Sequence, residues 1–118
     1  MKKTFLLLAG SGLLFASCLK DPGSITYVKT KDTAGNYKTT FAVGDTIITE
    51  AAIADQNFET YNWYQTGSNL VLLNSSSAQS AMFVANQAGA TSIELKIENC
   101  NDNSKCRQEY GSANITVQ

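Results

Sequence analysis

Strict alternation of apolar and polar residues is the clearest pattern in this chain. In residues 93–98, isoleucine and leucine alternate with glutamate and lysine, and the same period recurs in residues 47–53 and 113–117. A period of two is that of a β-strand with one buried face and one face in water. The pattern therefore predicts three strands of an antiparallel sheet that covers a core.

Shorter segments rich in β-branched and aromatic residues predict further strands, each bounded by turn-forming residues. Residues 32–36 form one such turn, and the segments on either side of it either pair as a hairpin or make one split first strand. Residues 107–111 are polar and are predicted to precede the last strand. Without a helical period after residue 18, this organisation predicts an all-β antiparallel sandwich of about seven strands. The predicted extended segments are 25–30, 37–43, 47–53, 60–65, 70–73, 81–85, 93–98 and 113–117.

The first residues of the chain have a different character. Met1-Lys2-Lys3 is cationic, residues 4–16 are apolar apart from Gly10-Ser11-Gly12, and small residues follow. This is the order of a secretory signal peptide, and the run is too short to cross a membrane, which needs about 20 apolar residues. Residues 5–15 show no polar face at the helical period, which disfavours a buried amphipathic helix of the domain. We therefore predict that residues 1–17 are a cleaved signal peptide.

Leu14-Phe15-Ala16-Ser17-Cys18 resembles the lipobox of bacterial lipoproteins, which usually has leucine, valine or isoleucine in place of Phe15. The resemblance implies cleavage before Cys18, a diacylglyceryl thioether on its sulfur and attachment to the membrane through acyl chains. Because each buried methylene contributes about 0.8 kcal/mol, two or three chains anchor a protein stably. By the same resemblance, Leu19 favours the outer membrane, and Lys20-Asp21 is similar to tags for surface export. A free thiol at Cys18 after ordinary signal cleavage is the alternative.

Removal of residues 1–17 leaves 101 residues, the size of one small domain. Residues 18–24 then form the lipidated cysteine and a short tether, and residues 25–118 form the domain. This mature part has 7 basic and 10 acidic residues and no basic cluster. Nucleic acid is therefore not expected as a partner.

Residues suited to catalysis or metal binding are few. The chain has no histidine, the commonest general base and a common ligand of transition metals. Ser75-Ser76-Ser77 therefore cannot form a serine triad, and neither Asp55 nor Asn101-Asp102-Asn103 has the acidic spacing of a calcium loop. A carboxylate pair for glycoside hydrolysis stays open from sequence. We expect no cofactor, no bound metal and no enzymatic activity.

Cys100 and Cys106 form an even pair in an exported domain and predict a disulfide. All five residues between them are polar or charged, and a hairpin would bring the two cysteines opposite each other. Closing so small a loop contributes about 2.4 kcal/mol in the chain-entropy model. A metal site is the alternative, although two thiolates without a histidine or a further cysteine would make a poor one.

Four short motifs follow one another along the chain: Val43-Gly44-Asp45-Thr46-Ile47, Tyr61-Asn62-Trp63-Tyr64, Ala81-Met82-Phe83-Val84, and Gly89 leading to Ile93-Glu94-Leu95-Lys96-Ile97. Their order over residues 38–118 resembles PKD and related immunoglobulin-like domains. The family signature Trp-x-Phe-Gly-Asp-Gly is Trp63-Tyr64-Gln65-Thr66-Gly67-Ser68 here. The resemblance implies an immunoglobulin-like sandwich in which Trp63 fills the core; a surface Trp63 that stacks on sugar is the alternative. The expected core residues are Trp63, Ile47, Leu95, Ile97 and Ile115.

Phe58, Tyr61 and Tyr64 are the aromatic residues most suited to contacting a ligand. They would form a patch for glycan or protein; the simpler alternative is one scattered surface aromatic and a second core residue. We therefore expect an exported, lipid-anchored envelope protein whose single immunoglobulin-like domain is a binding or spacer module for an unidentified protein or glycan. An accessory subunit of an envelope complex and a small carbohydrate-acting enzyme are the alternative functions.

Overall fold

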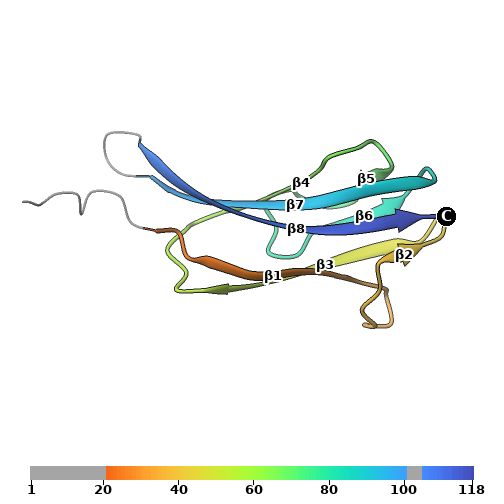
Figure 1. Cartoon of the computed structure of the whole chain (residues 1–118), viewed down its shortest axis with the longest axis horizontal. Coiled ribbons are helices and arrows are strands. Elements are labelled where there is room, and N and C mark those ends of the chain that lie inside the picture. Colours follow the sequence, from red (N-terminus) through yellow and green to blue (C-terminus); the bar gives the residue numbers. More distant parts are fainter. Residues whose placement is uncertain (1–20, 101–104) are drawn as a thin grey trace, which may run out of the picture.

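Eight strands form two four-stranded sheets that stack face to face in the computed structural model, which describes residues 21–100 and 105–118 (Figure 1). Cys18, the signal peptide and Asn101-Asp102-Asn103 lie outside the described residues. None of the described residues is helical, so they contain no helix that is long and apolar enough to cross a membrane. The strands are β1 (Ser24–Lys31), β2 (Thr40–Phe41), β3 (Thr46–Ala54), β4 (Tyr61–Gln65), β5 (Leu70–Leu72), β6 (Met82–Ala85), β7 (Gly89–Cys100) and β8 (Cys106–Val117).

The strand order confirms the predicted immunoglobulin-like sandwich. One sheet runs β1-β3-β6-β5 and the other β2-β8-β7-β4. These orders correspond to strands A-B-E-D and G-F-C of an immunoglobulin domain, with β2 added beside strand G. Every pairing is antiparallel except that of β2 with β8.

Of the two arrangements predicted for the first segments, the split first strand is the one formed. β1 pairs with β3 in the first sheet, and after the turn the chain crosses to the second sheet, where β2 pairs parallel with β8. A single bridge between Lys31 and Tyr37 is what remains of a hairpin. The crossing is fixed by the N–H of Lys38, which donates to the carbonyl of Thr30 (3.0 Å), and by the Thr30 hydroxyl, which donates to the Lys38 carbonyl (2.6 Å).

β7 and β8 form a hairpin that pairs residue for residue from Gly89–Val117 to Cys100–Cys106. β8 begins at Cys106, whereas the sequence predicted a strand only from residue 113. Residues 106–110 are exposed on both faces of the strand, so no apolar alternation marks them. Backbone pairing with β7, rather than burial, holds them extended.

The core lies between the sheets and contains the five residues expected there. Trp63 is 2% exposed, and its indole Nε1–H donates to the carbonyl of Ala78 (2.9 Å), so its polar atom is satisfied. A buried aromatic of this size dominates the apolar burial of a small domain. The buried apolar residues are Val28, Phe41, Ile47, Trp63, Leu70, Ala81, Phe83, Ala85, Ile93, Leu95, Ile97, Ile115 and Val117.

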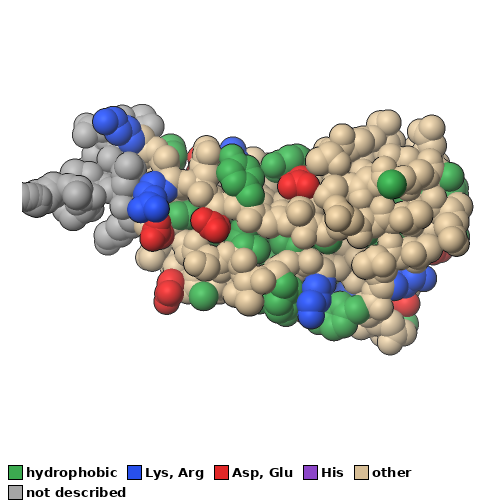
Figure 2. Space-filling model, viewed as in Figure 1, with side chains coloured by type: hydrophobic (Ala, Val, Ile, Leu, Met, Phe, Trp, Pro, Cys, Tyr) green, Lys and Arg blue, Asp and Glu red, His purple; other side chains and the backbone are tan. Residues whose placement is uncertain are grey.

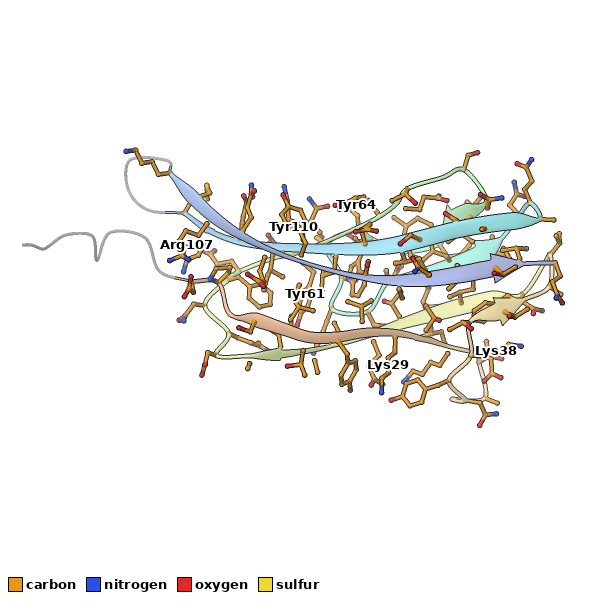
Figure 3. The ribbon with its side chains drawn as sticks, viewed as in Figure 1. Lys29, Lys38, Tyr61, Tyr64, Arg107 and Tyr110 are labelled. Atoms are coloured by element: carbon orange, nitrogen blue, oxygen red, sulfur yellow. A yellow bond between two sulfur atoms is a disulfide. The ribbon has the colours of Figure 1, made fainter. Side chains whose placement is uncertain are left out.

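The first described residues lie against the domain. The side chain of Pro22 is buried, and its carbonyl accepts a hydrogen bond from the N–H of Asn57 (2.9 Å). Asp21 forms an ion pair with Arg107 of β8 (2.6 Å). Figure 2 shows several charged side chains gathered at this end of the molecule, where the chain enters, and Figure 3 places Arg107 there.

Candidate binding surface

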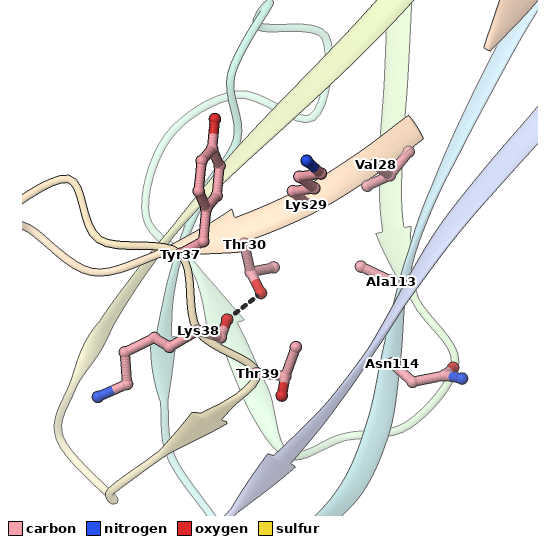
Figure 4. A pocket seen from close by; sticks show the side chains of 8 residues that line it. All are labelled: Val28, Lys29, Thr30, Tyr37, Lys38, Thr39, Ala113 and Asn114. Atoms are coloured by element: carbon pink, nitrogen blue, oxygen red, sulfur yellow. Dashed lines mark hydrogen bonds between the residues drawn. The ribbon is translucent and has the colours of Figure 1, made fainter. Parts of the chain in front are cut away.

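The crossing of the split first strand leaves a recess, which we call the split-strand groove. Its volume is about 530 Å³, and it lies between the end of β1, the chain that leads into β2, and β8 (Figure 4). Buried Val28 and half-buried Ala113 lie on its floor, and exposed Tyr37 stands on one wall. The lining residues are Val28, Lys29, Thr30, Tyr37, Lys38, Thr39, Ala113 and Asn114.

At one end of the groove, β1 and β8 pack closely against each other. A Cβ on Gly111 of β8 would lie 2.6 Å from Cγ2 of Ile25 and 2.9 Å from Cγ2 of Val28, so glycine permits this contact. Further along, β8 pairs with β2 at Thr116. Between these two positions nothing in the strand pairing fills the space beside β8.

A cluster of polar and aromatic side chains adjoins the groove on the outer face of β1 and β3. The Oε2 atom of Glu50 accepts hydrogen bonds from the hydroxyls of Tyr27 (2.8 Å) and Tyr37 (2.7 Å), and its Oε1 from Lys31 Nζ (3.1 Å). We call these four residues the Glu50 cluster. The Tyr37 and Tyr27 hydroxyls and Lys31 lower the pKa of Glu50 to about 2. Each tyrosine's own hydrogen bond to Glu50 is the main cause that raises its pKa, to about 12 for Tyr37 and above the usual value for Tyr27.

Two lysines flank the groove, each over an aromatic ring. Lys29 Nζ lies 4.4 Å from the ring centre of Tyr27 and 5.0 Å from that of Tyr37, and Lys38 Nζ lies 5.1 Å from that of Phe41. Such stacking is worth about 0.5–1 kcal/mol at exposed sites. The groove lining contains these two cations and no acidic side chain, although the chain as a whole is acidic.

The three aromatic residues suggested by the sequence do not form one patch. Phe58 and Tyr61 pack against the core and meet edge to face at 5.0 Å, so they close one end of the sandwich. Tyr64 lies on the opposite face of β4, where it is 40% exposed. Figure 3 shows Tyr61 between the layers, with Tyr64 and Tyr110 on the outer side of the second sheet. Partial burial and the carboxylate of Glu94 raise the pKa of the Tyr64 phenol.

The predicted disulfide is present between Cys100 and Cys106, at the end of the β7–β8 hairpin where the connecting loop joins the two strands. Glu98 is the third member of the group that could offer metal ligands, but both sulfur atoms are held in the disulfide bond. Asp55 is exposed in a turn with a φ of 54°, a conformation that aspartate tolerates. Within residues 21–100 and 105–118, no other group of three or more histidine, cysteine, aspartate or glutamate side chains comes close enough to share an ion.

The outer face of the first sheet carries an apolar patch on β3, β6 and the β5 segment. Met82 lies beside Ile48, and Val84 lies beside Val71 in the strand register. Val71 and Leu73 are about half exposed. Contiguous apolar surface of this kind often marks a protein contact. We call these five residues the outer apolar patch.

Sequence reasoning missed the Glu50 cluster and the groove. The available signal was the alternation of Tyr27, Lys29 and Lys31, which places all three on the outer face of one strand. Glu50 joins them only through the register of β1 with β3, in which it lies opposite Lys29. That register is set by pairing between residues far apart in the sequence.

No family model and no curated protein matches the chain. Among solved structures, it is similar to the solution structure of the PKD domain from the KIAA 1837 protein, with 19% identity over 69% of this chain and 79% of that one, and a TM-score of 0.49. It is also similar to a nucleoside hydrolase-related hypothetical protein from Saccharophagus degradans, described as associated with carbohydrate metabolism, with 18% identity and a TM-score of 0.48. That match covers 80% of this chain and 26% of the other. The immunoglobulin-like assignment stands on the strand order itself.

Proposed function

We propose that this protein is a lipoprotein of the bacterial envelope, attached to the outer membrane through acyl chains on Cys18, and that its immunoglobulin-like domain is a non-catalytic binding module. The split-strand groove is the observation that carries the proposal. Its volume of about 530 Å³ lies within the range of roughly 300–1,000 Å³ typical of ligand sites. An apolar floor, an aromatic wall and two flanking cations supply both contact area and orienting groups.

The direction of the chain supports a role in binding away from the membrane. Asp21, three residues after Cys18, is paired with Arg107 at one end of the domain. Lys29 lies part of the way along the molecule from that end, and Lys38 lies at the far end (Figure 3). An anchored domain would therefore hold the groove clear of the lipid surface.

The chemistry of the Glu50 cluster supports binding over catalysis. A general acid or base works best with a pKa near the operating pH. Glu50, whose pKa is about 2, stays ionised at neutral pH, and its oxygens already accept three hydrogen bonds. It serves to fix Tyr37 at the wall of the groove.

The anchor is tested by fractionating cells that express the native chain or the Cys18→Ala variant. We expect the native chain in the membrane fraction, carrying label from an alkyne fatty acid, and the variant in the soluble fraction without label. Lys20→Ala is the control and should remain membrane-bound. A Cys18→Ala variant that stays with the membranes would contradict lipid anchoring.

Binding is tested by titrating the full chain, in detergent micelles, with acidic and neutral oligosaccharides and with acidic and neutral peptides. At least one class should shift the NMR signals of Tyr37 and Thr39, while the mass of the ligand stays unchanged after prolonged incubation. If no class binds, the domain is a spacer. If the ligand is consumed, it is an enzyme.

The outer apolar patch favours a second candidate function, that of an accessory subunit with a fixed protein partner. Its exposed Val71, Leu73 and Met82 carry no charge, so they suit a partner surface that is itself flat and apolar. A photo-crosslinking residue at position 73 should then capture one stoichiometric membrane protein, and the same residue at position 110 should not. Equal labelling at both positions would dismiss this candidate.

A further inference from the structure

One side of the split-strand groove is a backbone edge that no strand covers. The N–H of Thr116 donates to the carbonyl of Thr39 (2.9 Å), so Thr116 directs its backbone groups away from β7. Because this direction repeats at every second residue, Asn114, which lines the groove, and Ser112, just beyond the lining, direct theirs the same way. The hydrogen bonding of β7 agrees, because the carbonyl of Ser92, opposite Asn114, accepts from the N–H of Thr66, the residue after β4. Both Asn114 and Ser112 are exposed.

The opposite side of the groove is a second backbone edge. The carbonyl of Thr30 accepts from the N–H of Lys38, so Thr30 faces away from β3, and Val28, two residues earlier, does the same. The N–H of Thr49, which lies opposite Thr30, donates to Ala81 on the far side of β3 and confirms this direction. In the described part of the chain, no strand pairing joins β1 to β8.

We infer that the groove takes an extended peptide, which adds to β8 as a strand in line with β2. This inference rests on the proposed binding function and names its ligand class. β2 pairs with β8 over two residues only, so an added strand would continue an existing parallel pairing toward Asn114 and Ser112. Strand addition draws affinity from backbone hydrogen bonds and specificity from alternate side chains.

The groove also defines the side chains of that peptide. Inward positions would meet Val28 and Ala113, which suit small apolar residues. Outward positions would pass Lys29 and Lys38. The Glu50 carboxylate lies beside Lys29 in the register of β1 with β3, but its oxygens already accept three hydrogen bonds, and the lining itself has no acidic side chain, so these positions suit glutamate or aspartate. The partner segment is therefore an extended peptide in which apolar and acidic residues alternate. The backbone N–H and C=O groups of Asn114 on one side and of Val28 on the other match a peptide backbone better than a sugar.

The test uses an acetylated hexapeptide of three Val-Glu repeats as probe, titrated into the full chain in detergent micelles. Binding should slow hydrogen exchange of the Ser112 and Asn114 amides, which a contact through side chains alone would leave unchanged. The same peptide with alternate backbone nitrogens methylated should bind at least about tenfold more weakly. A peptide of three Val-Lys repeats should also bind more weakly, because its charges oppose Lys29 and Lys38.

Asn114→Pro is the sharpest variant, because it removes an N–H that faces the groove and takes no part in pairing with β7. It should abolish probe binding and leave the far-UV spectrum unchanged, and Asn114→Ala, which keeps the N–H, should lose much less affinity than the proline variant. Should the proline variant fail to fold, Lys29→Gln gives a second reading: about threefold weaker binding, with Lys96→Gln on the other sheet as its control.

Three results would overturn the inference. In the first, the Val-Glu probe does not bind at millimolar concentration. In the second, the complex forms but the hydrogen exchange of the Ser112 and Asn114 amides does not change. In the third, the methylated peptide binds as tightly as the unmethylated one. Each of them leaves the proposed binding function standing if an oligosaccharide binds in the groove. If no class of ligand binds, both the peptide inference and the proposed binding function are contradicted.

Discussion

The β7–β8 hairpin and the split strand β1–β2 form neighbouring parts of the same sandwich in opposite ways. β7 and β8 pair over twelve consecutive residues, with one face buried along most of β7. β1 and β2 divide their pairing between the two sheets, and β2 keeps only two paired residues. In the β7–β8 hairpin, continuous pairing engages the backbone groups that the two strands direct toward each other. In the split strand, the interrupted pairing leaves a groove with backbone groups directed into it.

The difference assigns the stability of this domain mainly to the regular sheet and ligand recognition mainly to the split strand. Trp63, Leu95 and Ile97 lie on β4 and β7, so the regular sheet carries much of the core. The split strand contributes fewer large core residues and more polar surface groups. Substitutions in the first region should therefore change folding, and substitutions in the second should change binding.

Trp63→Ala should give the largest effect, because it removes the largest buried side chain of the regular sheet. We expect a loss of about 3–5 kcal/mol in the free energy of unfolding, measured by urea denaturation followed by far-UV circular dichroism. Tyr64→Ala, on the outer face of the same strand, should change it by about 0.5 kcal/mol or less. Similar losses in both variants would show that β4 does not hold the core as described.

Replacing both Cys100 and Cys106 with serine should give the next largest effect. Loss of this small covalent loop should cost about 2.4 kcal/mol in the free energy of unfolding, seen as a lower urea midpoint than that of the native, oxidised chain. Because the disulfide joins β7 and β8 at the loop end of their hairpin, away from the groove, ligand shifts at Tyr37 should persist. Their loss would mean that the hairpin end and the groove are not independent.

Gly111→Ala acts at the point where the two regions touch. The added methyl would meet Ile25 and Val28 at less than 3 Å, so β1 must move away from β8. We expect a destabilisation of about 1–3 kcal/mol and, unlike the first two changes, altered amide signals at Thr30 and Thr39. Ser112→Ala is the exposed control, and if it matched the glycine variant the close contact would have no special role.

The smallest effect is a pH dependence confined to the Glu50 cluster. The pKa of Glu50 is depressed to about 2, so its stabilising contribution is present above its unfolded pKa, about 4.5, and is lost as the pH falls toward 2. The pKa of Tyr37 is raised to about 12, so its contribution is present below pH 10 and is lost as the pH rises toward 12.

This pH dependence is measured by NMR titration of the Glu50 carboxyl carbon. Tyr37→Phe removes the largest cause of the lowered pKa, so the Glu50 midpoint should rise from about 2 toward its ordinary value. Tyr64→Phe, on the other sheet, should leave that midpoint in place. A midpoint that does not respond to Tyr37→Phe would contradict the hydrogen bond between Tyr37 and Glu50.

The same two regions show how far the sequence could predict the structure. Residues 93–98 were predicted correctly because one face of β7 is buried and the alternation records it. Residues 106–110 were missed because both of their faces meet water, so their strand depends on a partner rather than on a pattern. The core positions could be predicted for the same reason as β7, because buried positions are occupied by apolar residues.

The groove could not be predicted because no local pattern encodes it. Tyr27 and Glu50 are 23 residues apart and meet only once β1 has paired with β3. The sequence left a hairpin and a split strand equally open, and only the crossing to β8 produces the recess. Binding features that depend on where a strand stops pairing are therefore invisible until the register is known.

Buried Pro22 has a consequence for how an anchored molecule would stand on the bilayer. Asp21 is three residues after Cys18, and a segment of that length reaches at most about 11 Å. A protein anchored through Cys18 would therefore hold the Asp21–Arg107 ion pair close to the lipid headgroups. A partner strand aligned parallel to β8 would then have a set polarity, entering membrane-proximal at its amino end and leaving outward at its carboxyl end.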